Sequence, residues 1–296
     1  MERIFVLLRS PGSSTAVLLG ATLIALIVAN SPLATQYMSL VNLKLGPLTT
    51  MEWVNDALMA IFFLFVGLEV KRELVSGELN TNAKRIMPGI AALFGVLVPA
   101  IIYYLIAGFS EVYVHGWAIP TATDIAFAIG VITALGSRVP NSMKVFLTAL
   151  AVIDDLIAII VIAIFYAANL NLFYLFAAVV VTGLLIYCNR SGYVRSLSYI
   201  ILGIILWYCI LRSGLHATMA GVILAMTIPE RGKIGRKYVR PMQHWEHYLS
   251  NWVRFVIVPI FAFFNDGVSL GGFGLADLHN PVVLGVAIGL ILGTTI

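Results

Sequence analysis

Runs of apolar residues, separated by short polar stretches, follow one another along the whole chain. Most have about the length that an α-helix needs to cross a lipid bilayer. The ten runs cover residues 13–29, 53–70, 86–108, 114–135, 145–167, 171–188, 196–211, 213–229, 247–264 and 281–296. Because no long polar block separates the runs, we expect an all-α integral membrane protein with a single transmembrane domain, residues 1–296.

Composition agrees with this fold class. The 296 residues are 60% hydrophobic and 11% charged, whereas an ordinary soluble domain is about 25% charged. Arg3 and Arg9 precede the first run as in a signal peptide, but no convincing cleavage site follows, so we expect the run to be retained as the first span. Cys188 and Cys209 lack the spacing of metal ligands, and we expect two ordinary buried thiols.

The basic residues orient the spans. If the N-terminus is cytoplasmic, the 18 Lys and Arg residues lie on cytoplasmic segments except for three. The exceptions are Lys44, Arg212 and Arg254. This asymmetry satisfies the positive-inside rule at nearly every loop. Because an error in the number of spans would disturb the alternation, the distribution supports both the ten spans and the cytoplasmic N-terminus.

Three other segments have a recognisable local pattern. Within the loop 31–50, residues 41–46 partly alternate before a Gly-Pro pair, which predicts either a short hairpin or an irregular loop. Gly285, Gly289 and Gly293 repeat every four residues, which is typical of a face that packs closely against another helix. The last run stops at residue 296 without a polar flank, and we expect a chain cut within its tenth span.

Asp154 and Asp155 are adjacent within the fifth run, and no other charged residue occurs between Val145 and Ala168. A charged group at the centre of a transmembrane helix costs roughly 2.5–3.5 kcal/mol on insertion scales. Intramembrane acids of this kind usually face a water-filled cavity and bind ions or protons. The alternative is a structural ion pair, but the same span has no Lys or Arg to form one.

The chemistry of this pair is suited to cation–proton exchange. Carboxylate oxygens are the ligands that hard cations such as Na⁺ prefer. Burial and mutual repulsion oppose ionisation of both groups, so a carboxyl group of the pair holds either a proton or a metal cation. If the site is exposed to one side of the membrane at a time, this competition produces an antiporter.

Pro120 interrupts the fourth run and is followed by Thr121, Thr123 and Asp124. Proline removes a backbone donor and crowds the preceding turn. Broken helices at membrane depth are tolerated where they line a cavity or are buried in protein. The segment therefore predicts an unwound stretch beside an ion site, or a simple proline kink in which Asp124 caps the second half-helix.

Two further polar residues begin apolar runs. Asp56 opens the second run and lies either on an ion path or at a helix N-cap or packing contact. His216, near the start of the eighth run, is either a proton relay or an ordinary polar contact.

Charged clusters end the second run and begin the ninth. Residues 69–73 form the first cluster, and His244, Glu246 and His247 form the second. They predict either a sensor of cytoplasmic pH or a solvated interfacial face with ion pairs. Arg254 lies on the same helical face as Glu246 and is expected to snorkel or to pair with a carboxylate.

Five motifs resemble those of the bacterial NhaA-type sodium/proton antiporters. They occupy residues 53–59, 66–74, 118–130, 136–140 and 146–155, with the sequences WVNDALM, VGLEVKREL, AIPTATDIAFAIG, GSRVP and FLTALAVIDD. The resemblance covers nearly the whole chain. It implies an NhaA-like antiporter fold with a broken helix in span 4 and about ten transmembrane segments of a presumed twelve.

The resemblance also implies roles for individual residues. Asp155 would bind Na⁺ or Li⁺ and carry a proton, and Asp154 beside it would take part in transport or in a salt bridge. Thr123 and Asp124 would support the broken helix, and Asp56 would line the periplasmic side of the ion path. The residues implied in the pH response are Glu69, Arg72, Glu73, His216, Glu246 and His247.

The chain departs from the family pattern at two positions. The family carries a lysine after a glycine in the tenth span, whereas Gly293 is followed here by Thr294. A second histidine of the ninth-span region is replaced here by Ser250. The two spans that follow in the family are absent from this sequence.

These observations predict a secondary antiporter, not an enzyme, that expels Na⁺ or Li⁺ in exchange for H⁺ under pH regulation. It requires no organic cofactor and no nucleic-acid partner. The resemblance implies a homodimer in the bacterial inner membrane, joined through the loop 31–50. The alternatives are an intramembrane aspartyl protease, which adjacent and diverging aspartates disfavour, and a passive cation channel or sodium symporter.

Overall fold

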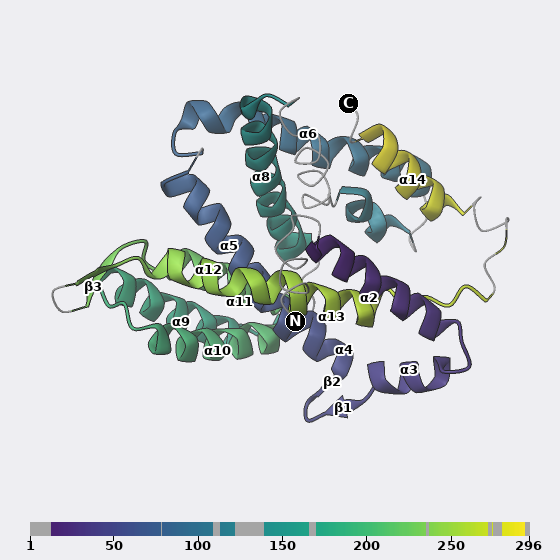
Figure 1. Cartoon of the computed structure of the whole chain (residues 1–296), viewed down its shortest axis with the longest axis horizontal. Helices are drawn as coiled ribbons and strands as arrows, with labels where there is room; N and C mark the ends of the chain where they lie inside the picture. The colour runs from purple at the N-terminus through teal and green to yellow at the C-terminus, as the bar shows by residue number, and fades with distance from the viewer. Residues whose placement is uncertain are drawn as a thin grey trace. The chain divides into compact units, whose positions relative to one another are not determined.

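The computed structural model describes residues 13–77, 79–108, 113–121, 139–165, 170–234, 237–271, 274 and 280–293. Most of these residues lie in helices, and the strands among them form two short hairpins (Figure 1). The prediction of a mostly helical chain is therefore confirmed. The chain divides into two compact units: unit 1 is Met1–Arg72 with Ile162–Ser269, and unit 2 is Glu73–Val161 with Leu270–Ile296.

Unit 1 contains most of the helices and both hairpins. Its α-helices are α2 (Ser13–Ala29), α3 (Ala34–Val41), α4 (Thr50–Glu52), α5 (Met59–Val75, which ends in unit 2), α9 (Leu172–Arg190), α10 (Ser196–Ser213), α11 (Met219–Thr227), α12 (Pro241–Trp252) and α13 (Val258–Asn265). Two π-helical segments, Trp53–Leu58 and Val253–Ile257, join α4 to α5 and α12 to α13. The antiparallel hairpins pair β1 (Lys44–Leu45) with β2 (Leu48–Thr49) and β3 (Gly232–Ile234) with β4 (Lys237–Val239).

Apolar side chains from five helices form the core of unit 1. Leu68 of α5, Leu185 of α9 and Leu206 of α10 belong to one cluster, which extends to α11 through Ala225 and to α12 through Met242. All five side chains are fully buried. The helices therefore pack through their apolar faces, and burial of this area from solvent stabilises the unit.

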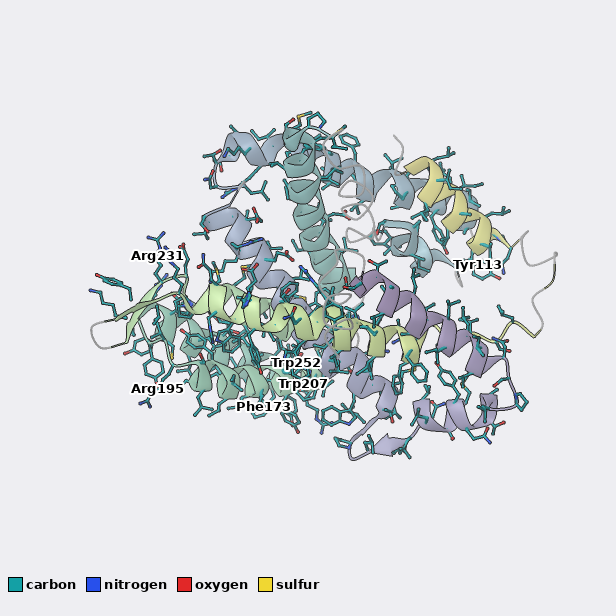
Figure 2. All side chains as sticks on the ribbon, viewed as in Figure 1. Tyr113, Phe173, Arg195, Trp207, Arg231 and Trp252 are labelled. Atoms are coloured by element: carbon teal, nitrogen blue, oxygen red, sulfur yellow. The ribbon has the colours of Figure 1, made fainter. Side chains whose placement is uncertain are left out.

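The outer faces of these helices are also apolar. Ile27 is 67% exposed, Ile204 is 60% exposed and Phe173, at the start of α9, is 74% exposed (Figure 2). Helices that are apolar on all sides are typical of membrane spans, whereas soluble proteins rarely expose contiguous apolar surface of this kind.

Five helical segments within the described residues are long and apolar enough to cross a bilayer, or six if the bent pair α2–α3 counts as one span. They are Thr50–Val75, Asn82–Ala107, Leu172–Arg190, Ser196–Ser213 and Pro241–Asn265. Each corresponds to a predicted run, and Ser13–Ala29 ends at the same residue as the first run. The predicted runs 114–135 and 145–167 lie partly outside the described residues, so the total of ten spans stays a prediction.

The predicted eighth run, 213–229, is not one helix. α10 ends at Ser213 because Gly214 adopts a left-handed conformation with φ of 86°. The next helix, α11, begins at Met219 and has 9 residues. At a rise of about 1.5 Å per residue it is roughly 14 Å long, which is less than the ~30 Å of hydrocarbon. The predicted boundary between the runs 196–211 and 213–229 agrees with the end of α10, but the prediction of one helix over 213–229 was wrong.

The loop 31–50 is more ordered than an irregular connection. It contains the short hairpin β1–β2, in agreement with one of the two alternatives, and also helix α3, which the sequence pattern did not predict. The helix is held by Tyr37, which is buried and whose hydroxyl donates to the Phe263 carbonyl of α13 at 2.6 Å. Tertiary contact therefore stabilises a helix of 8 residues that is marginal in isolation.

A capping box fixes the start of the second span. The Thr49 hydroxyl accepts from the Glu52 N–H at 3.2 Å, and the Glu52 carboxylate accepts from the Thr49 N–H at 2.6 Å. Trp53 then donates its indole N–H to the Leu45 carbonyl at 2.8 Å. Because the helix is capped by Thr49, the alternative that placed Asp56 at the N-cap was wrong.

Unit 2 contains α6 (Asn82–Ala107), a 3₁₀ helix (Val114–Thr121), most of α8 (Asn141–Phe165) and α14 (Pro281–Gly293). α14 packs against α6 through glycines. A Cβ on Gly285 would lie 3.0 Å from the Tyr103 ring, and one on Gly289 would lie 3.2 Å from the Pro99 carbonyl oxygen. The prediction of a close-packing face is confirmed for these two glycines.

Candidate functional site

The acidic pair lies in α8, within unit 2. Asp154 is buried, with 5% of its surface exposed, which agrees with its predicted place in the protein interior. Asp155 is the next residue of the helix. The side chain of Asp155 lies outside the part of the chain that the structure describes in atomic detail.

The predicted broken helix is described only up to Thr121. Residues 114–121 are 3₁₀-helical, and Pro120 is buried. The Thr121 hydroxyl donates to the Ala118 carbonyl at 2.8 Å, a local bond that replaces regular helical pairing beside the proline. Thr123 and Asp124 lie outside the described residues, so the break and the role of these two side chains stay predictions.

Unit 1 contains a polar cavity of about 480 Å³ between α5 and α12. Phe65 and Gln243 complete walls that are otherwise formed by ionisable or hydroxyl side chains. These are Glu69, Arg72, Glu246, His247, Ser250 and Arg254. Two charged clusters that are far apart in the sequence, at the end of one span and at the start of another, therefore meet in space.

An ion pair joins the two clusters. Arg72 Nε lies 3.3 Å from Glu246 Oε1, and the carboxylate side chain is 15% exposed. A partly buried pair is screened by salt less than one at the surface. Glu73, predicted in the same cluster, is half-buried and is not one of the residues that line the cavity.

A second set of residues meets at the other end of α5. Asp56 is half-buried in the π-helical segment, and its carbonyl accepts from the Trp207 indole N–H at 3.0 Å. Trp207, which is labelled in Figure 2, also stacks on Trp53, with the ring centroids 5.7 Å apart. His216 is exposed in the turn before α11 and interacts electrostatically with the Asp56 carboxyl group. The structure thus brings together two residues that the sequence had suggested separately.

The role of Lys71, a member of the cluster 69–73, was not predicted from the sequence. Its Nζ donates to the Met226 carbonyl at 2.7 Å, to the Ile228 carbonyl at 2.5 Å and, more weakly, to the Ala225 carbonyl at 3.3 Å. These carbonyls end α11, where the helix leaves acceptors unpaired and its dipole favours a cation. Lys71 therefore caps α11 from the neighbouring helix α5.

Small residues allow α5 and α11 to approach closely. A Cβ on Gly221 would lie 2.0 Å from the Ala60 carbonyl oxygen, and one on Gly67 would lie 2.7 Å from the Ala225 Cβ. The small residues Ala60 and Gly67 on α5, seven positions apart, and Gly221-x₃-Ala225 on α11 were the available sequence signal for this contact.

Replacing Gly221 with Ala is expected to lower the free energy of unfolding by about 2 kcal/mol, because the added methyl group overpacks the contact with α5. Helix propensity alone predicts the opposite result, because alanine stabilises a helix by up to about 1 kcal/mol relative to glycine. The midpoint of thermal unfolding in detergent measures the effect.

Gly183 is the matched control, since a Cβ there meets nothing within 4 Å. Gly183→Ala in α9 is expected to leave the midpoint unchanged or to raise it. Equal midpoints for the two variants would contradict the close approach of α11 to α5.

A separate cavity of about 690 Å³ in unit 1 is lined mainly by apolar side chains, among them Ile61, Ile204 and Leu224. One of its polar lining groups, the Ser196 hydroxyl, accepts from the Trp245 indole N–H at 3.2 Å. Such walls give a metal cation few oxygen ligands, so the charged residues described above are the better candidates for ion handling.

Apolar helices of spanning length, combined with buried and half-buried charged side chains inside the spans, define an integral membrane protein of the ion-transporter class. The profile of the Na⁺/H⁺ antiporter 1 family matches residues 6–296. The chain belongs to this family.

Named relatives agree with the family assignment over nearly the whole chain. The Na⁺/H⁺ antiporter NhaA of Mesorhizobium japonicum is 53% identical over 289 residues, which are 97% of this chain and 73% of the relative. The proteins of the same name from Rhizobium etli and Nitrobacter hamburgensis are each 49% identical, over 97% of this chain and 74% and 70% of their own lengths. The resemblance inferred from the five motifs is confirmed.

Proposed function

We propose that this protein is a secondary antiporter that expels Na⁺ or Li⁺ from the cytoplasm in exchange for protons. The single observation that carries the proposal is identity of about half the residues, over 97% of the chain, with relatives named as Na⁺/H⁺ antiporters. Antiporters are transporters and not enzymes, so the comparison disfavours the intramembrane protease. No organic cofactor is required, because the ions are the cargo.

Asp155 and Asp154 form the proposed exchange site. A carboxyl group releases its proton as Na⁺ or Li⁺ binds, and takes up a proton when the cation leaves. The burial of Asp154 supports this role. A carboxylate held away from bulk water is costly to leave bare, so it favours binding either a proton or a metal cation. Thr123 and Asp124 support the site from the proposed broken helix, and Asp56 lines the path beyond it. If two protons return for each Na⁺, membrane voltage contributes about 2.3 kcal/mol per charge at 100 mV.

The polar cavity is proposed to report cytoplasmic pH. A change in the protonation of His247 or Glu69 alters the charge balance around the Arg72–Glu246 ion pair. His216 is proposed to act similarly beside Asp56. The convergence of these groups in space supports a titrating unit, and Glu73 is proposed to contribute to it as a neighbour on α5.

The protein is proposed to lie in the bacterial inner membrane with a cytoplasmic N-terminus. It is further proposed to form a homodimer through the loop 31–50. The exposure of Leu43 and Leu45 around β1, 49% and 50%, supports a contact between copies at this hairpin.

Everted membrane vesicles test the proposed function. After respiration acidifies their interior, adding Na⁺ or Li⁺ is expected to dissipate the pH gradient, because the cation enters as protons leave. K⁺ serves as the control ion, and the host strain lacks its own Na⁺/H⁺ antiporters. A passive channel would collapse the voltage without moving protons, and a symporter would require an organic solute. The absence of any Na⁺-dependent response would overturn the proposal.

A further inference from the structure

Arg254 is a charged residue within the span Pro241–Asn265 that the proposed exchange site and pH response do not use. It lies in the π-helical segment Val253–Ile257, where the Val258 N–H donates to the Val253 carbonyl, five residues back. Single π-helical turns inside α-helices occur frequently at functional sites. An arginine within a span is itself uncommon and usually faces water or the protein interior.

Arg254 lines the polar cavity together with Glu246 and Ser250, which precede it by eight and four residues. This spacing places the three side chains on one helical face. Glu69 and Arg72 line the same cavity from α5. The volume of about 480 Å³ is many times what a single water molecule needs. A cation that enters can therefore remain hydrated and respond to the field of the walls.

The fixed charges of the cavity balance when Arg254 is included. Glu69 and Glu246 contribute two negative charges, and Arg72 contributes one positive charge that is already placed 3.3 Å from Glu246. Arg254 contributes the second positive charge, and His247 adds none while it is neutral. Without the Arg254 guanidinium group, the walls would carry one net negative charge.

We propose that Arg254 is a positioning residue that sets the electrostatic potential of the polar cavity and thereby weakens its hold on cations. The inference rests on the proposed Na⁺/H⁺ antiport. A neutral cavity does not accumulate Na⁺, and it disfavours divalent cations, which a negatively charged cavity would bind more tightly. Arg254 thus contributes to selectivity for monovalent cations through its charge and not through direct coordination.

The charge dependence gives the inference a specific signature. If the Arg254 charge lies about 10 Å from a cation in the partly aqueous cavity, its removal changes the occupancy of the cavity by a monovalent cation about threefold. The same change in potential acts on a divalent cation with twice the energy, so its occupancy changes about ninefold. A misfolded variant would not change the divalent occupancy by the square of the change in the monovalent occupancy.

Arg254→Gln in everted vesicles, where the proposed orientation exposes the cavity to the medium, tests the inference. The apparent KM for Na⁺ is expected to fall about threefold, and the concentration of Mg²⁺ that inhibits exchange by half is expected to fall about ninefold. Both effects should disappear at about 1 M choline chloride, where the Debye length is about 3 Å.

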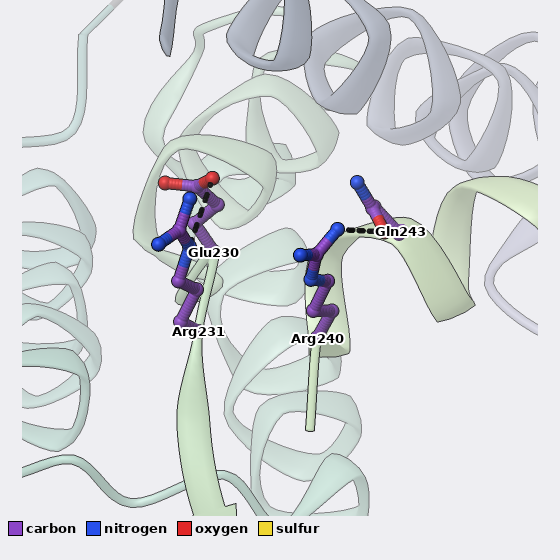
Figure 3. A network of polar contacts seen from close by, with 4 residues as sticks. All are labelled: Glu230, Arg231, Arg240 and Gln243. Atoms are coloured by element: carbon purple, nitrogen blue, oxygen red, sulfur yellow. Dashed lines mark hydrogen bonds and ion pairs between the residues drawn. The ribbon is translucent and has the colours of Figure 1, made fainter. Parts of the chain in front are cut away.

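Two variants control for charge and position. Arg254→Lys keeps the charge, and Arg231→Gln removes a surface charge that pairs with Glu230 at 3.5 Å, outside the cavity (Figure 3). Both are expected to keep the wild-type constants. If Arg254→Gln fails to reach the membrane, Ser250→Asp makes the same change of charge in the same cavity and should shift both constants in the same direction.

Unchanged constants in Arg254→Gln, or equal shifts in Arg254→Lys, would overturn the inference while leaving Na⁺/H⁺ antiport intact. Failure of the proposed function is a different result, because the wild-type protein would then show no response to Na⁺ at all.

Discussion

Asp155→Asn is expected to abolish the Na⁺-dependent collapse of the pH gradient in everted vesicles, while the protein still reaches the membrane. The amide has nearly the size and shape of the carboxyl group, so the packing of α8 should change little. However, an amide does not ionise, so it neither releases a proton nor offers a negative charge to Na⁺. Since the proposed exchange needs both steps at one group, the expected result is a complete loss and not a raised KM.

Asp266→Asn is a matched control for the loss of one acidic group. The Asp266 carboxylate accepts a hydrogen bond from the Thr22 hydroxyl at 2.7 Å. The amide oxygen of an asparagine can accept the same hydrogen bond. This variant is expected to keep wild-type exchange. Normal exchange by Asp155→Asn, at equal amounts of protein in the vesicles, would show that its carboxyl group is not where Na⁺ and H⁺ compete.

The transmembrane helices could be predicted well because hydropathy acts locally. A run of apolar residues long enough to cross the bilayer forms a helix whatever its neighbours are, since each backbone group must be paired inside the membrane. The first run, 13–29, ends at the same residue as α2. The glycine repeat of α14 was equally informative, because a missing Cβ is visible in the sequence and permits close packing.

Features that depend on tertiary contact were harder to predict. The break between the runs 196–211 and 213–229 agrees with the end of α10 at Ser213, but hydropathy did not show that the next helix begins only at Met219. Helix α3 is too short to be stable in isolation and is held by the bond from Tyr37 to the Phe263 carbonyl, 226 residues away. Contacts of this kind leave little trace in the local pattern of either segment.

In the candidate site, too, the individual residues could be predicted from the sequence but their contacts could not. Glu69, Arg72, Glu246 and His247 were recognised as charged groups in unusual places, and the structure brings them to one cavity. Their pairing was not deducible, because the Arg72–Glu246 contact joins two separate spans. The acidic pair was identified by its cost in the membrane, and the burial of Asp154 agrees with that reasoning.

Lys71→Met is expected to lower the free energy of unfolding by about 3 kcal/mol, more than any other single change considered for stability. Methionine retains most of the volume and apolar length of lysine. The decrease in the free energy of unfolding therefore measures the contribution of the ammonium group. Hydrogen bonds to a charged group contribute about 1.5–3 kcal/mol each, and a cation at a helix C-terminus contributes up to about 2 kcal/mol in partly buried positions. The estimate stays below the sum because the freed carbonyls of Met226 and Ile228 regain partial solvation.

The midpoint of thermal unfolding in detergent measures this effect, with an expected decrease of about 6–12 °C for a unit of this size. Lys44→Met is the control, because Lys44 is an exposed residue of β1 and its loss should leave the midpoint within about 2 °C. Lys71→Arg keeps the charge and is expected to recover part of the loss. A midpoint for Lys71→Met equal to that of Lys44→Met would mean that packing alone holds α11.

The combination with Gly221→Ala separates these two contributions. Lys71 caps the C-terminal end of α11, and Gly221 allows its N-terminal half to lie against α5. Both changes release the same helix of 9 residues from the same partner. Once one contact is lost, less remains for the second change to remove, so the double variant should lose less than the sum of the single losses. Strict additivity would instead mean that α5 holds the two ends of α11 independently.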